Sequence, residues 1–308
     1  MKTTKNVAII GLLLLGLSEI SLRLVGLTDF PIYYIDSEIR YLPKPNQHGD
    51  FLNKNDWYFN DKSMPTDRTW SSDAKRNIAL IGNSIVMGGN PYRQSEKISP
   101  LINQSIDKEY FVWPIAVGGW TTENEIAYLD KNRDIERSIV FFAWEYMSGG
   151  LSQANSWAGG YVFPLKRPVV ATWYVIRRYL IPRVIPGNLA NELPAIGEPR
   201  ADNTLKFDAK LTEFCQYGQD GCHGLIWLYP TKNELLRARN GGEWLPEREL
   251  IRGIADKHGL KIVDLADYPA WVPALYRPDG VHPSVEGNAV LAGILSGEII
   301  RETRIGAN

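Results

Sequence analysis

Residues suited to metal binding and thiol chemistry are scarce in this chain. Only two of the 308 residues are cysteine and only four are histidine. The two cysteines, Cys215 and Cys222, are separated by a spacing that matches no zinc or haem motif. They are expected to form a disulfide if the domain lies outside the cytoplasm, and otherwise to be two reduced, partly buried thiols. Neither a cofactor nor a bound metal is therefore predicted.

An excess of charge of either sign is also missing. The chain has 34 basic and 35 acidic residues, which gives a net charge of −1, and it contains no internal repeat or low-complexity tract. This balance does not favour a nucleic acid as partner. Aromatic residues are plentiful by contrast, with 10 Trp and 15 Tyr. They are expected mainly in the core, although a sugar-binding cleft would use the same residue types.

The N-terminal segment is strongly apolar. Lys2 and Lys5 precede an apolar run at 7–17, and further apolar residues continue to position 27. The run alone is too short to span a bilayer, which takes about 20 residues. The longer segment is expected to be an uncleaved membrane anchor with its lysines inside and the rest of the chain in the periplasm or at the cell surface. Glu19 and Arg23 are expected to pair on one helix face. A cleaved signal peptide or a buried helix are the alternatives.

Composition divides the chain into three regions. Residues 1–27 are interpreted as the signal anchor. Residues 28–74 contain several prolines and are expected to be a linker and covering segment with little regular structure. Residues 75–308 are interpreted as the main domain.

Strand and helix patterns alternate through the main domain. Buried strands are predicted at 77–81, 111–117, 138–143, 224–229 and 260–264. Helical patterns are found near 95–106, 122–132, 207–217, 246–258 and 284–303. This alternation predicts an α/β fold with a parallel sheet of about five strands, covered on both faces. Pro114 places the second strand at an edge or at a bulge.

Residues 148–205 interrupt this alternation. A turn-rich, aromatic stretch is followed by a compact apolar and basic helix. We expect an insertion over the active edge of the sheet. It would serve as a lid, as a substrate platform or as a helix at a membrane surface.

A glycine-flanked serine follows the first predicted strand. The sequence GNS at 82–84 carries the chain from the strand into a turn. Ligands bind outside the carboxyl ends of parallel strands, so Ser84 is placed where chemistry occurs. Gly82 allows a tight turn, and a helix beginning there would offer N–H groups to an oxyanion. The spacing differs from the G-x-S-x-G elbow, and helix capping is the alternative role of this serine.

Only one of the four histidines has a carboxylate just before it on a turn-rich loop. His282 lies in DGVHPS at 279–284, before the last predicted helix, and Asp279 precedes it by three positions. A serine needs a base at neutral pH, and the base needs an orienting carboxylate. His282 and Asp279 are therefore candidate partners of Ser84, and a turn with a helix cap is the alternative. A minor alternative is a divalent-cation site, with the ligands Asp264, Asp267, Asp279 and His282.

Taken together, the GNS and DGVHPS blocks resemble the SGNH/GDSL hydrolase superfamily. The resemblance implies a flavodoxin-like three-layer α/β/α sandwich with Ser84 as nucleophile, His282 as base and Asp279 as its orienting group. It also implies an oxyanion hole built from the N–H groups of Ser84 and of a glycine after the second strand. Gly119 fits that position best, and Gly118 is also possible.

The third block of the family departs from the pattern. Members usually place an asparagine after the third strand, where its side chain donates to the oxyanion. Glu145 falls at this position here. An ionised carboxylate cannot donate a hydrogen bond, so Glu145 would join the oxyanion hole only if it is protonated. Asn83 replaces the usual aspartate of the first block, which is a milder change.

The N-terminal region is similar to a membrane-anchored subgroup of this superfamily. The features it shares are Glu19, Arg23, Leu24 and Gly26 at the end of the apolar segment, the Pro-rich linker, and PTKNE at 230–234. Such proteins are associated with O-acyl groups on surface polysaccharides. The resemblance therefore implies an esterase or acyltransferase that acts on acyl esters of polysaccharide through an acyl-serine intermediate. A catalytically weak carbohydrate-binding or assembly protein with the same fold is the alternative.

Overall fold

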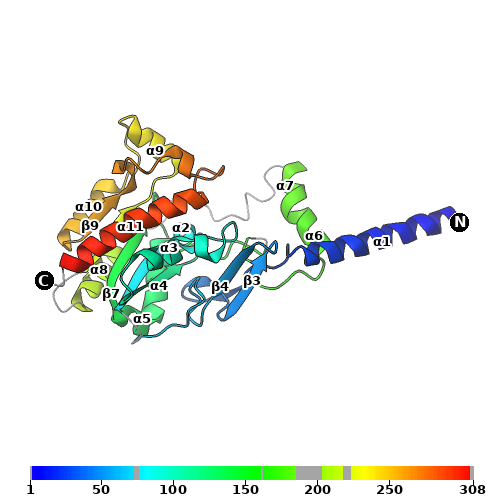
Figure 1. Ribbon diagram of the computed structural model, residues 1–308, viewed down its shortest axis with the longest axis horizontal. Helices are drawn as coiled ribbons and strands as arrows, with labels where there is room; N and C mark the ends of the chain where they lie inside the picture. The colour runs from blue at the N-terminus through cyan, green and yellow to red at the C-terminus, as the bar shows by residue number, and fades with distance from the viewer. Residues whose placement is uncertain (1, 73–75, 161, 185–202, 218–222, 306–308) are drawn as a thin grey trace.

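A parallel five-stranded sheet forms the centre of the protein (Figure 1). The computed structural model describes residues 2–72, 76–160, 162–184, 203–217 and 223–305. The strands lie in the order β6-β5-β7-β8-β9, which is 2-1-3-4-5 in chain order and is the order of flavodoxin-like sheets. Their bounds are β5 (Arg76–Gly82), β6 (Tyr110–Ala116), β7 (Ile139–Tyr146), β8 (Gly224–Leu228) and β9 (Lys261–Asp264). The predicted α/β fold with a parallel sheet is confirmed.

The strands are continuous apolar runs because both faces of the sheet are covered. Every residue of β8 is buried, as are the last six residues of β7. Such runs are typical of parallel sheets between two helix layers. Pro114 lies in β6, an edge strand of the sheet, where a residue without an N–H is tolerated. Its predicted place at an edge is confirmed.

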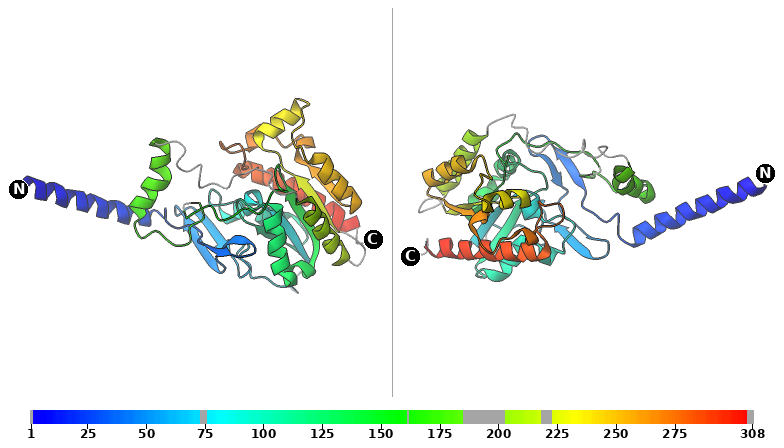
Figure 2. Two further views of the ribbon diagram at one scale, coloured as in Figure 1. Left: turned by 180° about the vertical axis from the view of Figure 1, so that it is seen from behind. Right: turned by 90° about the horizontal axis from the view of Figure 1, so that it is seen from above.

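Helices cover the sheet in two groups (Figure 2). In one group α3 (Ile98–Ser105) packs against α11 (Val285–Ile305). In the other, α4 (Thr122–Lys131) packs against α8 (Thr204–Tyr217), and α10 (Arg248–Lys257) contacts β9. All five were predicted. The short helices α5 (Arg133–Ser138) and α9 (Lys232–Arg239) were not, because each is too short to show a clear apolar period.

The segment before the sheet is more regular than its prolines suggested. It contains two antiparallel hairpins, formed by β1 (Tyr33–Asp36), β2 (Arg40–Pro43), β3 (Gln47–Phe51) and β4 (Asn55–Phe59). Tyr41 of β2 donates a hydrogen bond to the carbonyl oxygen of Gly118, and Trp120 donates to the carbonyl oxygen of Tyr41. The hairpins are thus held against the carboxyl edge of the sheet.

Helix α1 (Lys2–Leu24) is held by the insertion and not by the sheet. It contacts α6 (Ala171–Val175), which continues as a π-helical turn (Ile176–Leu180) and as α7 (Ile181–Val184). The Glu19 carboxylate accepts the backbone N–H groups of Ala171 and Thr172 and pairs with Arg23 at 2.7 Å. The predicted pairing of Glu19 with Arg23 is confirmed. These two backbone bonds, with the neighbouring Arg23, lower the pKa of Glu19 to about 2.

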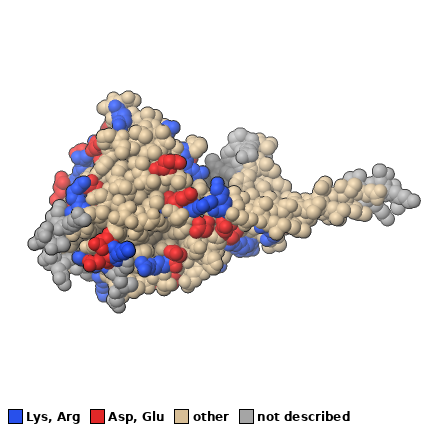
Figure 3. All heavy atoms as spheres, viewed as in Figure 1, with Lys and Arg blue, Asp and Glu red and all other residues tan. Residues whose placement is uncertain are grey.

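The prediction of a membrane-spanning anchor is contradicted. Across the described part of the chain, no helix combines the length and the apolar character needed to cross a bilayer. The predicted localisation, in which a single N-terminal membrane helix holds the main domain outside the cytoplasm, is contradicted with it. The physical reason lies in Glu19 and Arg23, which interrupt the apolar sequence and fix the end of α1 to the insertion through polar bonds. On the face of the molecule that Figure 3 shows, acidic and basic side chains are interspersed.

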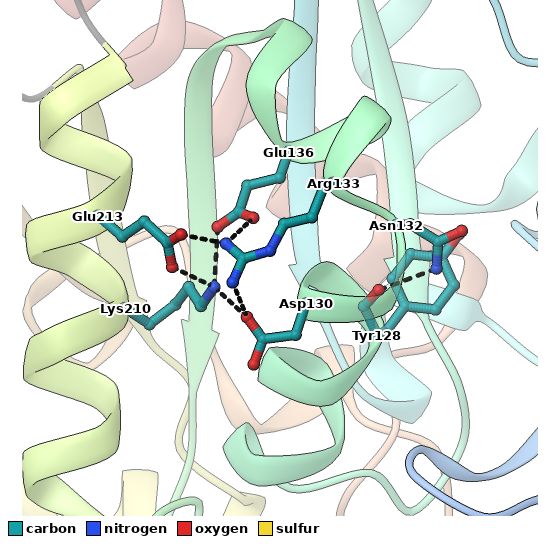
Figure 4. Close-up of polar contacts among 7 residues, drawn as sticks. All are labelled: Tyr128, Asp130, Asn132, Arg133, Glu136, Lys210 and Glu213. Atoms are coloured by element: carbon teal, nitrogen blue, oxygen red, sulfur yellow. Dashed lines mark hydrogen bonds and ion pairs between the residues drawn. The ribbon is translucent and has the colours of Figure 1, made fainter.

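A partly buried cluster of ion pairs joins α4, α5 and α8 (Figure 4). The ammonium group of Lys210 lies 2.5 Å from Asp130, 2.9 Å from Glu136 and 2.6 Å from Glu213. Arg133 pairs with the same three carboxylates. The carboxylates are close enough to hold a metal ion, but the two side-chain cations already occupy the space between them. The cluster therefore fastens three helices on one face of the sheet.

The cysteine prediction is only partly covered by the described residues. Cys215, on α8, is disulfide-bonded. Its predicted partner, Cys222, lies outside the residues that the structure describes.

Candidate active site

Ser84 stands at the carboxyl end of β5, as the first residue of α2 (Ser84–Met87). The Asn83 side chain caps this helix by accepting the N–H of Ile85 at 3.1 Å. The helix is a single turn and is closed by Gly88, whose φ of 78° favours glycine. The predicted tight turn is present, and a short helix begins there. The turn is needed because it brings a strand-end side chain out to the edge of the sheet.

Gly82 makes the turn possible by leaving room for Glu145. A Cβ atom at position 82 would lie 2.2 Å from Glu145 Oε2 and 2.7 Å from a methyl group of Val86. Glu145 Oε2 accepts the backbone N–H of Asn83 at 3.0 Å. The Glu145 side chain from the central strand β7 therefore lies directly under the serine turn, and any larger residue at position 82 would displace it.

Three side chains from two distant segments form a hydrogen-bonded chain. His282 Nε2 lies 3.0 Å from Ser84 Oγ, and its Nδ1 lies 3.2 Å from Asp279 Oδ2. The other oxygen of Asp279 accepts the backbone N–H groups of Val281 and His282, each at 2.9 Å. Partial burial alone would raise the pKa of Asp279, but these N–H donors and the imidazole outweigh it and the pKa is lowered. Asp279 is therefore suited to orient the imidazole as an ionised acceptor.

Several backbone contacts fix the loop that carries His282. The carbonyl oxygen of His282 accepts the N–H of Arg277 at 2.8 Å, which closes the loop on itself. Tyr92 donates to the carbonyl of Pro283 at 2.5 Å, and Tyr229 donates to that of Val281 at 2.6 Å. The two tyrosines come from separate segments, Tyr92 from the loop after α2 and Tyr229 from the position directly after β8. The imidazole is thus held toward Ser84 by tertiary contacts as well as by Asp279.

The two glycines predicted for the oxyanion hole differ in their position. Gly118 lines the cavity at Ser84: a Cβ built on Gly118 would lie 3.8 Å from Ser84 Cβ. Its N–H points to the sulfur of Met87 at 3.1 Å. Gly119 has a φ of 79°, does not line this cavity, and its carbonyl oxygen accepts a bond from Asn155 at 2.6 Å. Of the two predicted positions, Gly118 is the one beside the nucleophile.

A cavity of about 700 Å³ opens in front of Ser84 and His282. One wall comes from the first hairpins and the other from the insertion. Aromatic side chains are frequent in the lining, which includes Phe30, Tyr33, Phe51, Phe163, Tyr174 and Tyr179. Volumes of this size are typical of sites for small-molecule or short-chain ligands. The predicted insertion over the active edge therefore contributes directly to the site.

Glu145 does not face this cavity as a family-type donor. Its carboxyl is buried, its Oε2 is bonded to Asn83, and its Oε1 has no hydrogen-bond partner among the described residues. Burial raises the pKa of Glu145 well above its usual range. A carboxyl whose pKa is raised in this way resists ionisation, which weakens any repulsion of a forming oxyanion. Its contact with Asn83 makes it a support of the serine turn.

This geometry predicts different effects for two replacements of Glu145. Glu145→Gln keeps an oxygen that can accept the Asn83 N–H, so kcat for ester cleavage should stay within about threefold of wild type. Glu145→Ala removes the support and should lower kcat roughly 10- to 100-fold through misplacement of Ser84. Steady-state kinetics on a chromogenic ester would measure both. Equal, large losses in the two variants would show that the carboxyl proton itself is required.

A second buried carboxyl contacts Trp144, the residue next to Glu145 in β7. Glu125 of α4 accepts the indole N–H of Trp144 at 2.6 Å, and burial raises its pKa from 4.5 to about 8. Between these values the unfolded chain loses a proton that the folded chain keeps. Glu125 therefore stabilises the fold most below pH 4.5, and this contribution declines as the pH rises toward 8.

Replacing Glu125 by glutamine should remove that decline. The amide oxygen can still accept the Trp144 N–H, while the variant has no proton to lose. We expect the free energy of unfolding of wild type to fall, relative to Glu125→Gln, by about 1.4 kcal/mol per pH unit between pH 5 and 8. Urea unfolding at a series of pH values would measure the difference. Parallel pH profiles would contradict a neutral Glu125 in the folded protein.

The minor metal alternative is not supported by the positions of its ligands. Asp264 and Asp267 lie beside Arg248 at 2.6 and 3.4 Å. Asp279 is bonded to His282 instead. Among the described residues, the only cluster with metal-site spacing is the one that Lys210 and Arg133 fill.

Sequence reasoning missed part of the cavity wall. Arg277 and Arg178 both line the cavity, and neither was proposed as a site residue. Arg277 lies two positions before Asp279, so its closeness to the site was readable from the sequence. Arg178 lies in the insertion, where no motif marks it, and only the packing of the insertion over the sheet edge places it here.

Comparisons with known proteins give a distant likeness of fold. No protein-family profile and no curated relative matches the chain. A lipase/acylhydrolase from Enterococcus faecalis is 17% identical with a TM-score of 0.44, over 73% of this chain and 95% of that one. A carbohydrate acetylesterase family member from Sinorhizobium meliloti is 12% identical with a TM-score of 0.41, over 73% and 97%. A psychrotrophic esterase from Pseudoalteromonas sp. is 11% identical with a TM-score of 0.39, over 74% and 98%. The evidence for the chemistry of the site is the geometry of Ser84, His282 and Asp279.

Proposed function

We propose that the protein is a serine-dependent ester hydrolase or acyltransferase of the SGNH/GDSL type. The observation that carries this proposal is the chain of contacts from Ser84 through His282 to Asp279 at the wall of the cavity. A nucleophile, a base and an orienting carboxylate in hydrogen-bond reach are the parts that acyl transfer needs. The substrate class we propose is an acyl ester, such as an acetyl ester, of a polysaccharide.

The residues divide the reaction into two steps. Ser84 Oγ attacks the carbonyl carbon of the ester while His282 Nε2 accepts the hydroxyl proton. The imidazolium then gives this proton to the departing alcohol, which leaves the acyl group on Ser84. In the second step His282 takes a proton from water, the hydroxide oxygen attacks the acyl carbon, and Ser84 regains its proton. A sugar hydroxyl in place of that water would make the second step a transfer.

The oxyanion of each step would be bound by backbone donors. The N–H groups of Ser84 and of Gly118, the glycine beside Ser84, are the proposed donors. In this proposal Glu145 supports the turn through Asn83 and does not contribute a donor from the third strand. The loss of one such donor costs about 10²- to 10³-fold in rate, so a modest turnover is expected.

That missing donor also favours a second candidate function. A catalytically weak carbohydrate-binding or assembly protein would retain the cavity and the fold without needing fast turnover. The two candidates are separated by covalent labelling with a fluorophosphonate, followed by mass spectrometry of the modified peptide. Labelling of Ser84 that is absent in Ser84→Ala and strongly slowed in His282→Ala supports the enzyme. Absence of labelling in the wild-type protein supports the binding protein.

A further inference from the structure

Two arginines, Arg178 and Arg277, line the cavity. Among the described residues, neither Arg178 nor Arg277 forms an ion pair with a carboxylate, although both line the cavity. Among the described residues of the lining, Asp279 is the one acidic side chain, and it is bonded to His282. Arg167 shows the contrasting case, since it lies outside this lining and pairs with Asp29 at 2.9 Å. An arginine in a concave site that has no acidic partner is suited to bind an anion from outside.

Both guanidinium groups lie over aromatic rings. The guanidinium carbon of Arg178 lies 5.9 Å from the ring centre of Tyr174 and 5.8 Å from that of Tyr179. The guanidinium carbon of Arg277 lies 5.7 Å from the ring centre of Tyr92. Cation–π contacts limit the conformations of a long side chain, so little order is lost when an anion binds. The guanidinium N–H groups can then meet an acceptor in bidentate geometry.

The rest of the lining suits a chain of sugar rings. The aromatic side chains are flat, and the apolar faces of sugar rings stack on flat rings as hydrocarbon does. The tyrosines add hydroxyl groups that can meet sugar hydroxyls. The volume of about 700 Å³ leaves room for more than the acyl group of a small ester. Aromatic platforms together with two unpaired guanidinium groups match a sugar chain that carries anionic groups.

We propose that the cavity takes an acidic carbohydrate ester, and that Arg178 and Arg277 select it by binding its carboxylate groups. This inference rests on the proposed ester chemistry of Ser84 and adds the charge of the substrate to it. The two arginines are specificity-determining residues in this proposal. They come from the insertion and from the His282 loop, so the site is complete only when the insertion covers the sheet edge.

The proposal is tested by binding measurements on a matched pair of ligands. One ligand is a tetrameric oligogalacturonate, and the other is the same tetramer with every carboxylate converted to an amide. Isothermal calorimetry with the wild-type protein should give a Kd for the acidic tetramer about 10- to 100-fold lower than for the neutral one. Arg178→Gln and Arg277→Gln should each lose most of this preference, and the difference should shrink as salt is raised.

Two controls keep the result specific. Arg68→Gln removes the same charge from an exposed arginine over the ring of Phe111, away from the cavity, and should retain the preference. Thermal unfolding of all three variants should match wild type, because the changed side chains are only partly buried or exposed. Equal binding of the two tetramers by wild type would overturn the proposal. A preference for the acidic tetramer that survives when Arg178→Gln and Arg277→Gln are combined would overturn it too. Stronger binding of lysophosphatidylglycerol micelles than of the acidic tetramer would assign the arginines to a lipid headgroup and also overturn it.

Ester cleavage is measured separately, so that the two proposals fail in different ways. Wild type and Ser84→Ala are compared on acetylated oligogalacturonate and on its acetylated, amidated form. Ser84-dependent cleavage with no charge preference refutes the arginine sites alone. A charge preference in binding without Ser84-dependent cleavage refutes the ester chemistry and keeps the anion sites. Faster cleavage of the acidic ester, through a lower KM that Arg178→Gln raises, supports both.

Discussion

Replacing Ser84 by alanine is expected to lower kcat for ester cleavage by roughly 10⁴-fold or more, and His282→Ala should do nearly the same. The two side chains are 3.0 Å apart and act in one proton transfer. Removing either one leaves the other without a function, so the double variant should be little worse than either single variant. Initial rates on a chromogenic acetate, together with the free energy of unfolding of each variant, would measure this.

The size of the Asp279 effect refines the test. Asp279→Asn keeps the shape of the side chain but no longer offers a charged acceptor to His282 Nδ1, so kcat should fall strongly while binding of a neutral ester changes little.

Losses in kcat that multiply when Ser84→Ala and His282→Ala are combined would contradict a shared mechanism. Full activity of Ser84→Ala would remove the assignment of the nucleophile altogether.

Replacing Lys210 by methionine is expected to lower the free energy of unfolding by about 3–5 kcal/mol. The Lys210 side chain is 3% exposed and contacts three carboxylates, of which Glu136 is fully buried. Methionine fills a similar volume without charge, so the main cost is the negative charge left behind around Arg133. Urea unfolding at pH 7, followed by circular dichroism, would measure the change. Figure 4 shows why the loss is not local, since the cluster joins three helices.

A neighbouring lysine supplies the control for this prediction. Lys206, one helical turn away on α8, pairs with Glu123, but its side chain is 59% exposed. Lys206→Met should change the free energy of unfolding by less than about 1 kcal/mol, because exposed ion pairs contribute little. Adding Glu136→Gln to Lys210→Met should recover part of the lost stability by removing one unpaired charge. Equal stability of Lys210→Met and wild type would mean that the cluster contributes nothing.

The architecture was readable from the sequence because its signals are local. Continuous apolar runs between helical periods predicted β5 to β9, and Pro114 predicted an edge strand. The two hairpins before the sheet were not predicted, since their strands are short and their prolines suggested extended chain. The membrane anchor was predicted from the apolar run, its flanking lysines and a resemblance, and none of these shows the bonds that Glu19 accepts from the N–H groups of Ala171 and Thr172.

For the candidate site, the sequence by itself determined which residue types are available and at which strand ends they lie. Ser84 follows a strand, and Asp279 and His282 share one short loop, so each could be proposed from neighbouring residues. Only the tertiary structure decided that Ser84 and His282, 198 positions apart, meet at 3.0 Å. It also decided that Glu145 turns under the serine turn and that Arg178 reaches the cavity. The physical reason is that strand pairing and side-chain burial between distant segments set these directions, and no local pattern records them.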